Sequence, residues 1–445
     1  MKMKSAQNDM TVGNPMKIIL SFTFPIFLGN VFQQFYNMAD AVIVGKFVGN
    51  KALAAVGSTG TIMFLIYGFV VGMTAGFTVL TAQKFGAGDM EGMRKTVVGA
   101  GVLSFVIGTI LTILFMVFMK PLLILMNTPS DIFADSYVYI MIVSGGILAQ
   151  MLYNLLSSIL RALGNSKLPL YFLIISAILN IFGDLFFVIV LKAGSNGCAI
   201  STVLSEALCC LFCIIYIQKK VPILRLGKKW LVFDARLLKK TIAYGWASAM
   251  QQATVQMGKI AIQALVNTMG VSVAAAFAVV NRIDDFAITP EQNIAHAMTA
   301  LMAQNKGAGK NDRMREGFRC GMILELVYGA AVMLICLGFA RPLMSLFVKD
   351  EEVIGHGVVY LHLIAVMYIL PAVTNALQGF FRGIGDLKVT LVSSFTNMTV
   401  RVIAAAPMVL LWNFGIEALP YSYLAGWIAM LLVETTLMLR IYRKK

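Results

Sequence analysis

The chain consists of long apolar segments separated by short polar stretches. About 20 apolar residues suffice to cross a bilayer as a helix, and a backbone without water must be helical there. Twelve segments reach that length: 15–44, 52–81, 96–118, 134–160, 168–191, 196–218, 237–267, 272–303, 317–340, 355–380, 388–411 and 416–440. The pattern predicts an all-α polytopic membrane protein with twelve transmembrane helices.

The two halves of the chain resemble each other. Residues 82–88 (AQKFGAG) match residues 303–309 (AQNKGAG), 221 positions later. At the same offset, 120–122 and 161–164 match 341–343 and 382–385. Each half holds six predicted helices, and an even number gives both halves the same orientation, as in parallel transporter repeats. We therefore expect an N-lobe (1–218), a cytoplasmic linker (219–236) and a C-lobe (237–445), with a central cleft that can open to either side.

The composition is typical of a membrane protein, and this changes how the positive net charge is interpreted. Of 445 residues, 59% are hydrophobic and 13% are charged, whereas soluble domains carry about 25% charged residues. A net charge of +15 would suggest a nucleic-acid partner in a soluble protein. Here Lys and Arg concentrate in alternate loops, which predicts that these loops and both termini are cytoplasmic. The basic residues of the opposite loops are Lys46, Lys51, Lys120, Lys192, Arg341 and Lys349. We expect a lipid bilayer and no nucleic acid as partner.

Asp40 lies near the outer end of the first apolar segment. A carboxylate in hydrocarbon is costly, so it marks a functional position unless it is paired or hydrated. Asn180 and Asp184 are four residues apart in the segment 168–191 and share one helix face. Thr202 follows in the next segment, and helix rise places these four residues at similar depth. The sequence predicts that they form one site.

Three interpretations of this site remain open from the residues alone. Two carboxylates in one low-dielectric pocket repel each other, so one can hold a proton near neutral pH. The same oxygens, with an amide and a hydroxyl, could instead bind Na⁺. A third interpretation makes Asp184 a structural acid paired with a neighbour. The positions 221 residues after Asp40, Asn180 and Asp184 are Ala261, Arg401 and Ala405, so the acids do not serve a scaffold common to both halves.

Further polar residues are candidates for lining a substrate cleft. They are Gln33, Gln34, Tyr36 and Asn37 before Asp40, and Glu291 and His296 after Pro290. Hydrogen bonding between helices is the competing explanation for the first group, and interior pairing for the second. Pro25 removes one helical hydrogen bond and could let its helix bend.

These stretches resemble the multidrug and toxic compound extrusion (MATE) family. The resemblance covers nearly the whole chain and rests on Pro25 to Gly45, the hairpins at 83–88 and 304–309, Asn281-Arg282, and Arg161 and Arg382 with their glycines. It implies two six-helix lobes in a V shape and export of organic cations in exchange for H⁺ or Na⁺.

The resemblance extends to the branch named for the DNA-damage-inducible protein F. In that branch Asp40, Asn180, Asp184 and Thr202 match the N-lobe cation site, and Tyr139 belongs with them. The branch also implies that protonation of the helix acid bends the helix near Pro25. Another bacterial branch places acids in the C-lobe segments 237–267 and 355–380. Here the first offers Gln256 and Lys259, and the second offers Asn375 and no acid, so a C-lobe Na⁺ site of that kind is not expected.

We therefore predict a monomeric secondary active antiporter of a prokaryotic cytoplasmic membrane that exports amphipathic, mostly cationic small molecules. It would need no cofactor beyond H⁺ or Na⁺ as coupling ion and would not be an enzyme. The main alternative is a lipid-intermediate flippase of the same superfamily. A prenyltransferase that uses Asp284-Asp285 to hold Mg²⁺-diphosphate and a passive channel are more distant alternatives.

Overall fold

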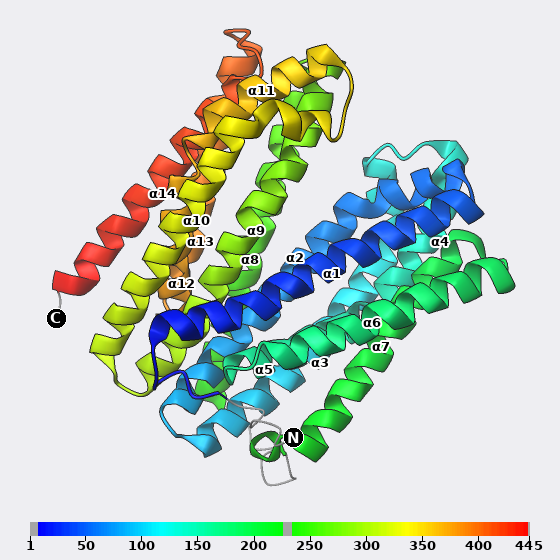
Figure 1. The fold of residues 1–445 in the computed structure, drawn as a ribbon. Coiled ribbons are helices and arrows are strands. Elements are labelled where there is room, and N and C mark those ends of the chain that lie inside the picture. Colours follow the sequence, from blue (N-terminus) through cyan, green and yellow to red (C-terminus); the bar gives the residue numbers. More distant parts are fainter. Residues whose placement is uncertain (1–7, 226–233, 444–445) are drawn as a thin grey trace. The chain divides into compact units, whose positions relative to one another are not determined.

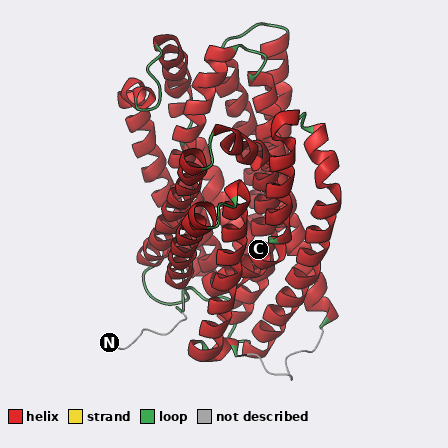
Figure 2. Ribbon diagram, turned by 90° about the vertical axis from the view of Figure 1, so that its right-hand side faces the viewer, coloured by secondary structure: helices red, strands yellow, loops and turns green. Residues whose placement is uncertain are grey.

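A computed structural model describes residues 8–225 and 234–443, with side chains up to Arg440. In this part of the chain the secondary structure is helical, with no strand (Figure 2). The α-helices are α1 (Pro15–Phe47), α2 (Asn50–Gly86), α3 (Met90–Leu125), α4 (Ser130–Gly145), α5 (Ile147–Ala162), α6 (Lys167–Leu185), α7 (Gly194–Lys220), α8 (Ala235–Val266), α9 (Val271–Gly307), α10 (Asn311–Ser345), α11 (Glu351–Ala365), α12 (Ile369–Ile384), α13 (Leu387–Leu410) and α14 (Ala418–Arg443). A π-helix, η1 (Phe186–Val190), extends α6, and a 3₁₀ turn, η2 (Pro222–Leu224), follows α7.

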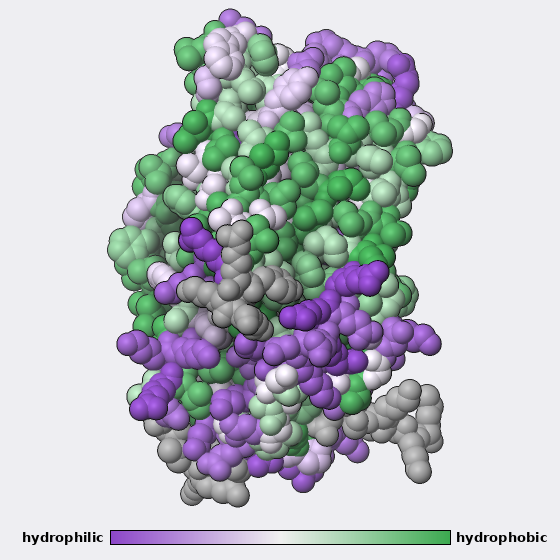
Figure 3. Space-filling view, turned by 90° about the vertical axis from the view of Figure 1, so that its left-hand side faces the viewer, coloured by the Kyte–Doolittle hydropathy of each residue, from purple (hydrophilic) through white to green (hydrophobic). Residues whose placement is uncertain are grey.

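All twelve predicted segments contain helix, which confirms the predicted all-α membrane architecture (Figure 1). Within the described ranges, eight helices are long and apolar enough to span a membrane, and two bent pairs bring the number to ten. The helices α8 and α9 cover the other two predicted segments and are less apolar. One face of the molecule shows hydrophobic side chains across its middle and hydrophilic side chains gathered towards its ends (Figure 3).

Two predicted helices, 134–160 and 355–380, are each divided in two, so the prediction of unbroken helices there was wrong. The helix axis bends by 45° between α4 and α5, and by 53° between α11 and α12. The first break falls at Gly145-Gly146, where glycine adds backbone freedom. The second precedes Pro371, which has no N–H to continue the helical ladder.

The internal repeat is visible in the helices themselves. The helices α2 and α9 begin 221 residues apart, at Asn50 and Val271, and end at Gly86 and Gly307. The breaks also repeat, because Gly146 and the turn residue Met367 are 221 positions apart. A broken helix at the same place in both halves indicates that the bend belongs to the shared scaffold.

The described chain forms two compact units. Unit 1 combines the residues up to Met10 with Phe24–Ala249, and unit 2 combines Thr11–Thr23 with the chain from Met250 onward. The helices α1 and α8 are therefore each divided between the units. The predicted partition at the linker 219–236 stays a prediction, and residues 226–233 of that linker lie outside the described part.

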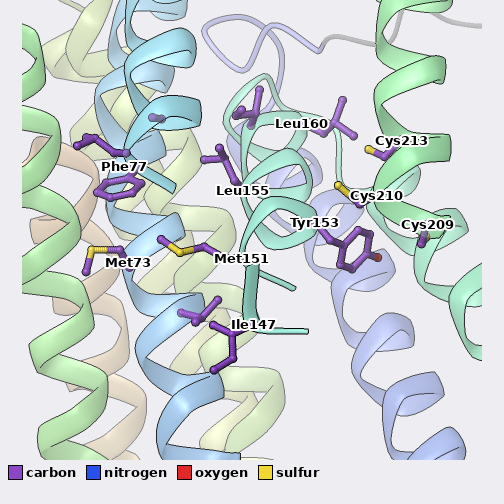
Figure 4. Close-up of a cluster of buried hydrophobic side chains, with 14 of the residues drawn as sticks. Met73, Phe77, Ile147, Met151, Tyr153, Leu155, Leu160, Cys209, Cys210 and Cys213 are labelled. Carbon is purple, nitrogen blue, oxygen red and sulfur yellow. The ribbon is translucent and has the colours of Figure 1, made fainter. Parts of the chain in front are cut away.

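The core of unit 1 is built around α5, which contacts α2 and α7. Met151 and Leu155 of α5 are buried with Met73 and Phe77 of α2 (Figure 4). Tyr153 faces the other way, towards the buried thiols of α7: Cys209, Cys210 and Cys213. In a bilayer such contacts stabilise through close packing rather than through removal of apolar surface from water.

Glycines let α2 and α8 approach closely within unit 1. A Cβ atom at Gly76 would lie 2.4 Å from the carbonyl oxygen of Tyr244, and a Cβ at Gly245 would lie 2.1 Å from the ring of Phe77. These distances leave no room for any side chain without a backbone shift. Small residues at a helix crossing are a common device of membrane proteins.

We expect Gly76→Ala to lower the melting temperature of the detergent-solubilised protein, because the overpacked crossing costs about 1–3 kcal/mol. The matched control is Gly60→Ala on the same helix, where an added Cβ meets no atom within 4 Å. This control should raise stability by about 0.5–1 kcal/mol, since alanine restricts the helix backbone more than glycine. Equal shifts in both variants would show that the close approach does not constrain the crossing.

The loop between α2 and α3 contains an ion pair outside the apolar segments. Asp89 caps α3 by accepting a hydrogen bond from the Gly92 N–H at 2.8 Å, and Lys84 Nζ lies 2.6 Å from its Oδ2. The Lys84 hydrogen bond, followed by the Gly92 N–H, lowers the pKa of the Asp89 carboxyl. A lowered pKa in the folded state means that the carboxylate stabilises the fold above its unfolded pKa, and that this contribution is lost as the pH falls through the folded pKa.

We therefore expect Asp89→Asn to reduce stability at neutral pH by at most about 1 kcal/mol, the range of exposed ion pairs. The gap between the variant and the wild type should close as the pH is lowered, because the wild-type carboxyl becomes neutral. Melting temperatures of both proteins across acidic and neutral pH measure this. A gap that is independent of pH would contradict the assignment.

Candidate functional site

Asp40 of α1 and Asp184 of α6 lie side by side in unit 1. Their carboxyl groups interact directly with each other. Asp184 is fully buried, and Asp40 is partly buried. Oδ1 of Asp40 and both carboxyl oxygens of Asp184 have no hydrogen-bond donor among the described residues. Two adjacent carboxylates in such surroundings repel each other strongly, so the pair needs a proton or a cation to balance it.

Asn180 connects the acid pair to α7. Its Nδ2 donates to Thr202 Oγ1 at 3.2 Å, and Ser201 Oγ donates to its backbone oxygen at 2.8 Å. Oδ1 of Asn180 has no donor within the described chain, so it remains a further acceptor. The side chains of Ser201 and Cys198 adjoin Asp184. The helix crossing is tight here, because a Cβ at Gly183 would lie 2.4 Å from Ser201 Oγ.

Two tyrosines complete the surroundings of the acids. Tyr139 of α4 interacts electrostatically with Asp40 and Asp184, and Tyr36 of α1 interacts with Asp40 and Glu206. The structure thus brings together all the predicted coupling residues, within one compact unit: Asp40, Asn180, Asp184, Thr202 and Tyr139. Their role in coupling stays a prediction.

The outer end of α6 departs from regular helix beside this site. The π-helix η1 begins at Phe186, two residues after Asp184. Such widened turns occur frequently at functional sites. Val188 of η1 packs with Ile43 and Val44 of α1 and with Cys198 of α7. This apolar cluster holds the ends of the three helices together one turn beyond Asp40.

The predicted cleft residues of α1 divide into two groups. Gln33 donates a hydrogen bond from Nε2 to the Tyr67 hydroxyl at 3.1 Å, and Tyr36 is partly buried. Gln34 and Asn37 are exposed on another side of the helix. Pro25 lies inside α1, which is one uninterrupted helix.

Glu206 is a half-buried acid near the site that the sequence analysis did not single out. Gln150 Nε2 donates to its Oε1 at 3.4 Å, and its charge acts on Tyr36 and Tyr67. It follows Thr202 by four residues and therefore shares a face of α7 with it. That spacing was visible in the sequence and was the available signal.

In unit 2, the structure separates the two C-lobe candidates. Glu291 is fully buried and accepts a hydrogen bond from Asn375 Nδ2 at 3.4 Å, whereas His296 is exposed.

The neighbouring acids Asp284 and Asp285 have different surroundings. Asp284 is buried and accepts a hydrogen bond from the Tyr368 hydroxyl, whereas Asp285 is exposed and pairs with Lys259 at 3.4 Å. The arrangement does not resemble a paired acidic site for Mg²⁺-diphosphate.

The position in unit 2 that corresponds to Asn180 holds a fixed positive charge. Arg401 follows Asn180 by 221 residues and is buried. Its guanidinium carbon lies 3.7 Å from the ring centroid of Tyr423 and 5.5 Å from that of Trp427. Tyr423 and Trp427 follow Thr202 and Glu206 by the same offset. The repeat thus places a cation between aromatic rings where unit 1 has unbalanced acids.

The oxygens of the unit 1 site fit a proton or a hard cation. The acceptors without donors are oxygens of Asp40, Asp184 and Asn180, which are the ligand types that Na⁺ prefers. Within the described ranges no group of three or more His, Cys, Asp or Glu side chains is arranged to hold a metal. Of the two ions, a proton shared by the carboxyls of Asp40 and Asp184 needs fewer ligands than Na⁺ does.

Known proteins match the chain over most of its length. The family model described as MatE matches residues 25–186 and 247–407, once in each half. The chain is 31% identical over 407 residues to the probable multidrug resistance protein YpnP of Bacillus subtilis, covering 88% of both proteins. It is 28% identical to YoeA of the same organism, another probable multidrug resistance protein, covering 86% of this chain and 84% of that protein. A FAD transporter of Shewanella oneidensis is 22% identical, with 84% of both covered.

Solved structures share the fold. An outward-facing multidrug resistance MATE family transporter of the MOP superfamily matches with a TM-score of 0.91 at 22% identity, covering 100% of this chain and 99% of that one. A MATE structure in the bent conformation gives 0.91 at 22% identity, covering 98% and 97%. These likenesses confirm the predicted MATE fold. The family model and the named relatives confirm a transporter rather than an enzyme, while the DNA-damage-inducible F branch stays a prediction. The chain therefore belongs to the MatE family of membrane transporters.

Proposed function

We propose that the protein is a secondary active multidrug efflux antiporter that exports amphipathic organic cations by alternating access in exchange for H⁺ or Na⁺. The matched relatives named as probable multidrug resistance proteins support the substrate class. The observation that carries the coupling is the buried Asp40–Asp184 pair, whose interacting carboxyls leave three oxygens without a donor in the described chain. Such a pair binds one positive charge or remains unbalanced.

The chemistry of coupling follows from that imbalance. When a proton or Na⁺ sits between the two carboxyls, α1 and α6 are held together at this point, and Asn180 Oδ1 supplies a further acceptor. When the ion leaves, the repulsion between the carboxylates favours separation of α1 from α6. Because α1 is divided between the two units, a shift of its outer part can alter how the transporter opens. The comparison with unit 2 supports this proposal. At the position that corresponds to Asn180, unit 2 carries the permanent charge of Arg401, which cannot be replaced by a solvent ion, whereas the unit 1 site has two acids and no such base among the described residues.

The same proposal covers the setting. The transporter lies in a prokaryotic cytoplasmic membrane with both termini in the cytoplasm, as the loop charges indicate. It acts as a monomer, and its coupling ion is its only small cofactor. Gln33, Tyr36 and Glu206 contribute the polar lining near the coupling site. A lipid-intermediate flippase is the alternative that the transport experiment tests.

We expect proteoliposomes to move ethidium, a fluorescent organic cation, when a pH gradient is imposed, and Asp40→Asn and Asp184→Asn each to abolish this movement. The physical reason is that one remaining carboxylate no longer shares a proton with a second. Asp135→Asn is the control, because Asp135 is an exposed acid of α4. Normal driven transport in both site variants would refute coupling through this pair. No movement under a pH or Na⁺ gradient would favour the flippase.

We also expect Thr202→Val to retain pH-driven transport within about tenfold of wild type. The substitution removes the hydroxyl that accepts from Asn180, and one neutral hydrogen bond contributes about 1 kcal/mol. A shared proton needs only the carboxyls, whereas a Na⁺ cage would lose a ligand. Initial rates at varied pH and Na⁺ measure this. Complete loss of transport, with Na⁺-driven movement in the wild type, would replace the proton by Na⁺.

A further inference from the structure

Unit 2 contains a second pair of buried acids that the proposed coupling mechanism does not use. Glu291 of α9 and Glu325 of α10 are both 0% exposed and interact electrostatically with each other. A Cβ placed at Gly329 would lie 3.5 Å from Glu291 Oε1. Gly329 follows Glu325 by one helical turn, so Glu291 points at the face of α10 that carries Glu325.

The oxygens of this pair lack donors. Oε1 of Glu291 and both carboxyl oxygens of Glu325 have no hydrogen-bond partner among the described residues. Only Oε2 of Glu291 accepts a hydrogen bond, from Asn375. Burying an ionised carboxylate without a partner is far more costly than burying the neutral acid. The contacts therefore favour a state in which the pair carries a proton.

The surrounding charges do not balance the acids. Arg382 of α12 interacts with Glu325 and also with Glu434 of α14, and Glu434 is itself fully buried. One guanidinium cannot neutralise three carboxylates. Tyr328 of α10 interacts with both members of the pair, but a neutral phenol adds no positive charge.

The internal repeat excludes a scaffold role shared by both halves. The residues 221 positions before Glu291 and Glu325 are Val70 and Ser104, both buried in unit 1. The shared fold thus tolerates an apolar and a small neutral residue at these places. Asp40 and Asp184 show the reverse asymmetry, since alanine replaces each in the second half. Each unit therefore carries its own acid pair, at different places in the fold.

We propose that Glu291 and Glu325 form a second proton-binding site, within unit 2, in which the two neighbouring buried carboxyls together hold at least one proton. Its participation in transport rests on the proposed antiport, whereas proton binding itself does not. The site adds a second titrating position to the transporter, separate from Asp40 and Asp184.

The test is infrared spectroscopy of the full-length protein in lipid, because the C=O stretch of a neutral carboxyl is distinct from that of a carboxylate. Spectra are recorded across a pH series in the Asp40→Asn/Asp184→Asn background, so that the unit 1 pair contributes nothing. We expect a carboxylic acid band that disappears as the pH rises. Because Glu206, Asp284 and Glu434 can add to this band, the readout is the difference between the background and each further variant. The differences for Glu325→Gln and Glu291→Gln should each contain a titrating carboxylic acid band, and the difference for Glu316→Gln, which replaces an exposed acid of α10, should contain none.

Three outcomes would overturn the proposal. One is a background protein without any titrating carboxylic band, which needs no further variant and so does not depend on their folding. Another is a band whose titration is the same in the background and after both Glu291→Gln and Glu325→Gln. The third is a band that titrates in sodium chloride but not in choline chloride, which would assign the site to an alkali cation. Failure of ethidium transport, by contrast, would refute the antiport without affecting this titration.

Discussion

The constraint on which the unit 1 site depends is the cost of holding two carboxyl groups together without a base. Asp40 and Asp184 interact directly while three of their oxygens have no donor among the described residues. Water and salt weaken the repulsion within a surface pair, but packed helices keep water from Asp184 and from Oδ1 of Asp40. The tight α6–α7 crossing at Gly183 and the apolar cluster around Val188 hold the ends of α1, α6 and α7 together beside the pair.

The repeat shows how one scaffold can hold different chemistry. The helix breaks at Gly146 and Met367 recur at one offset because both halves need the same bend. The polar interior does not recur: Asn180 corresponds to Arg401, and Thr202 to Tyr423. In unit 2 the guanidinium between aromatic rings supplies a permanent charge. In unit 1 no base among the described residues acts on the acid pair, and we therefore propose an exchangeable ion there.

The sequence predicted the parts of the structure that depend on periodicity and chain length. All twelve helical segments follow from apolar length, and the grouping of Asp40, Asn180, Asp184 and Thr202 follows from the fixed rise of a helix. The divided helices were missed because hydrophobic length does not report a bend. The π-helix after Asp184 was missed because it adds one residue to a turn without altering the apolar pattern.

The pairing of Glu325 could not be obtained from position alone, since it depends on which face of a helix meets which neighbour. Glu325 lies in an apolar run that would suit lipid, and only the approach of α9 at Gly329 places Glu291 against it. Arg382 then interacts with two acids at once. Charge balance in a membrane interior is a property of such groups rather than of single residues. An acid whose partners are distant in sequence therefore becomes interpretable only after the helices are packed.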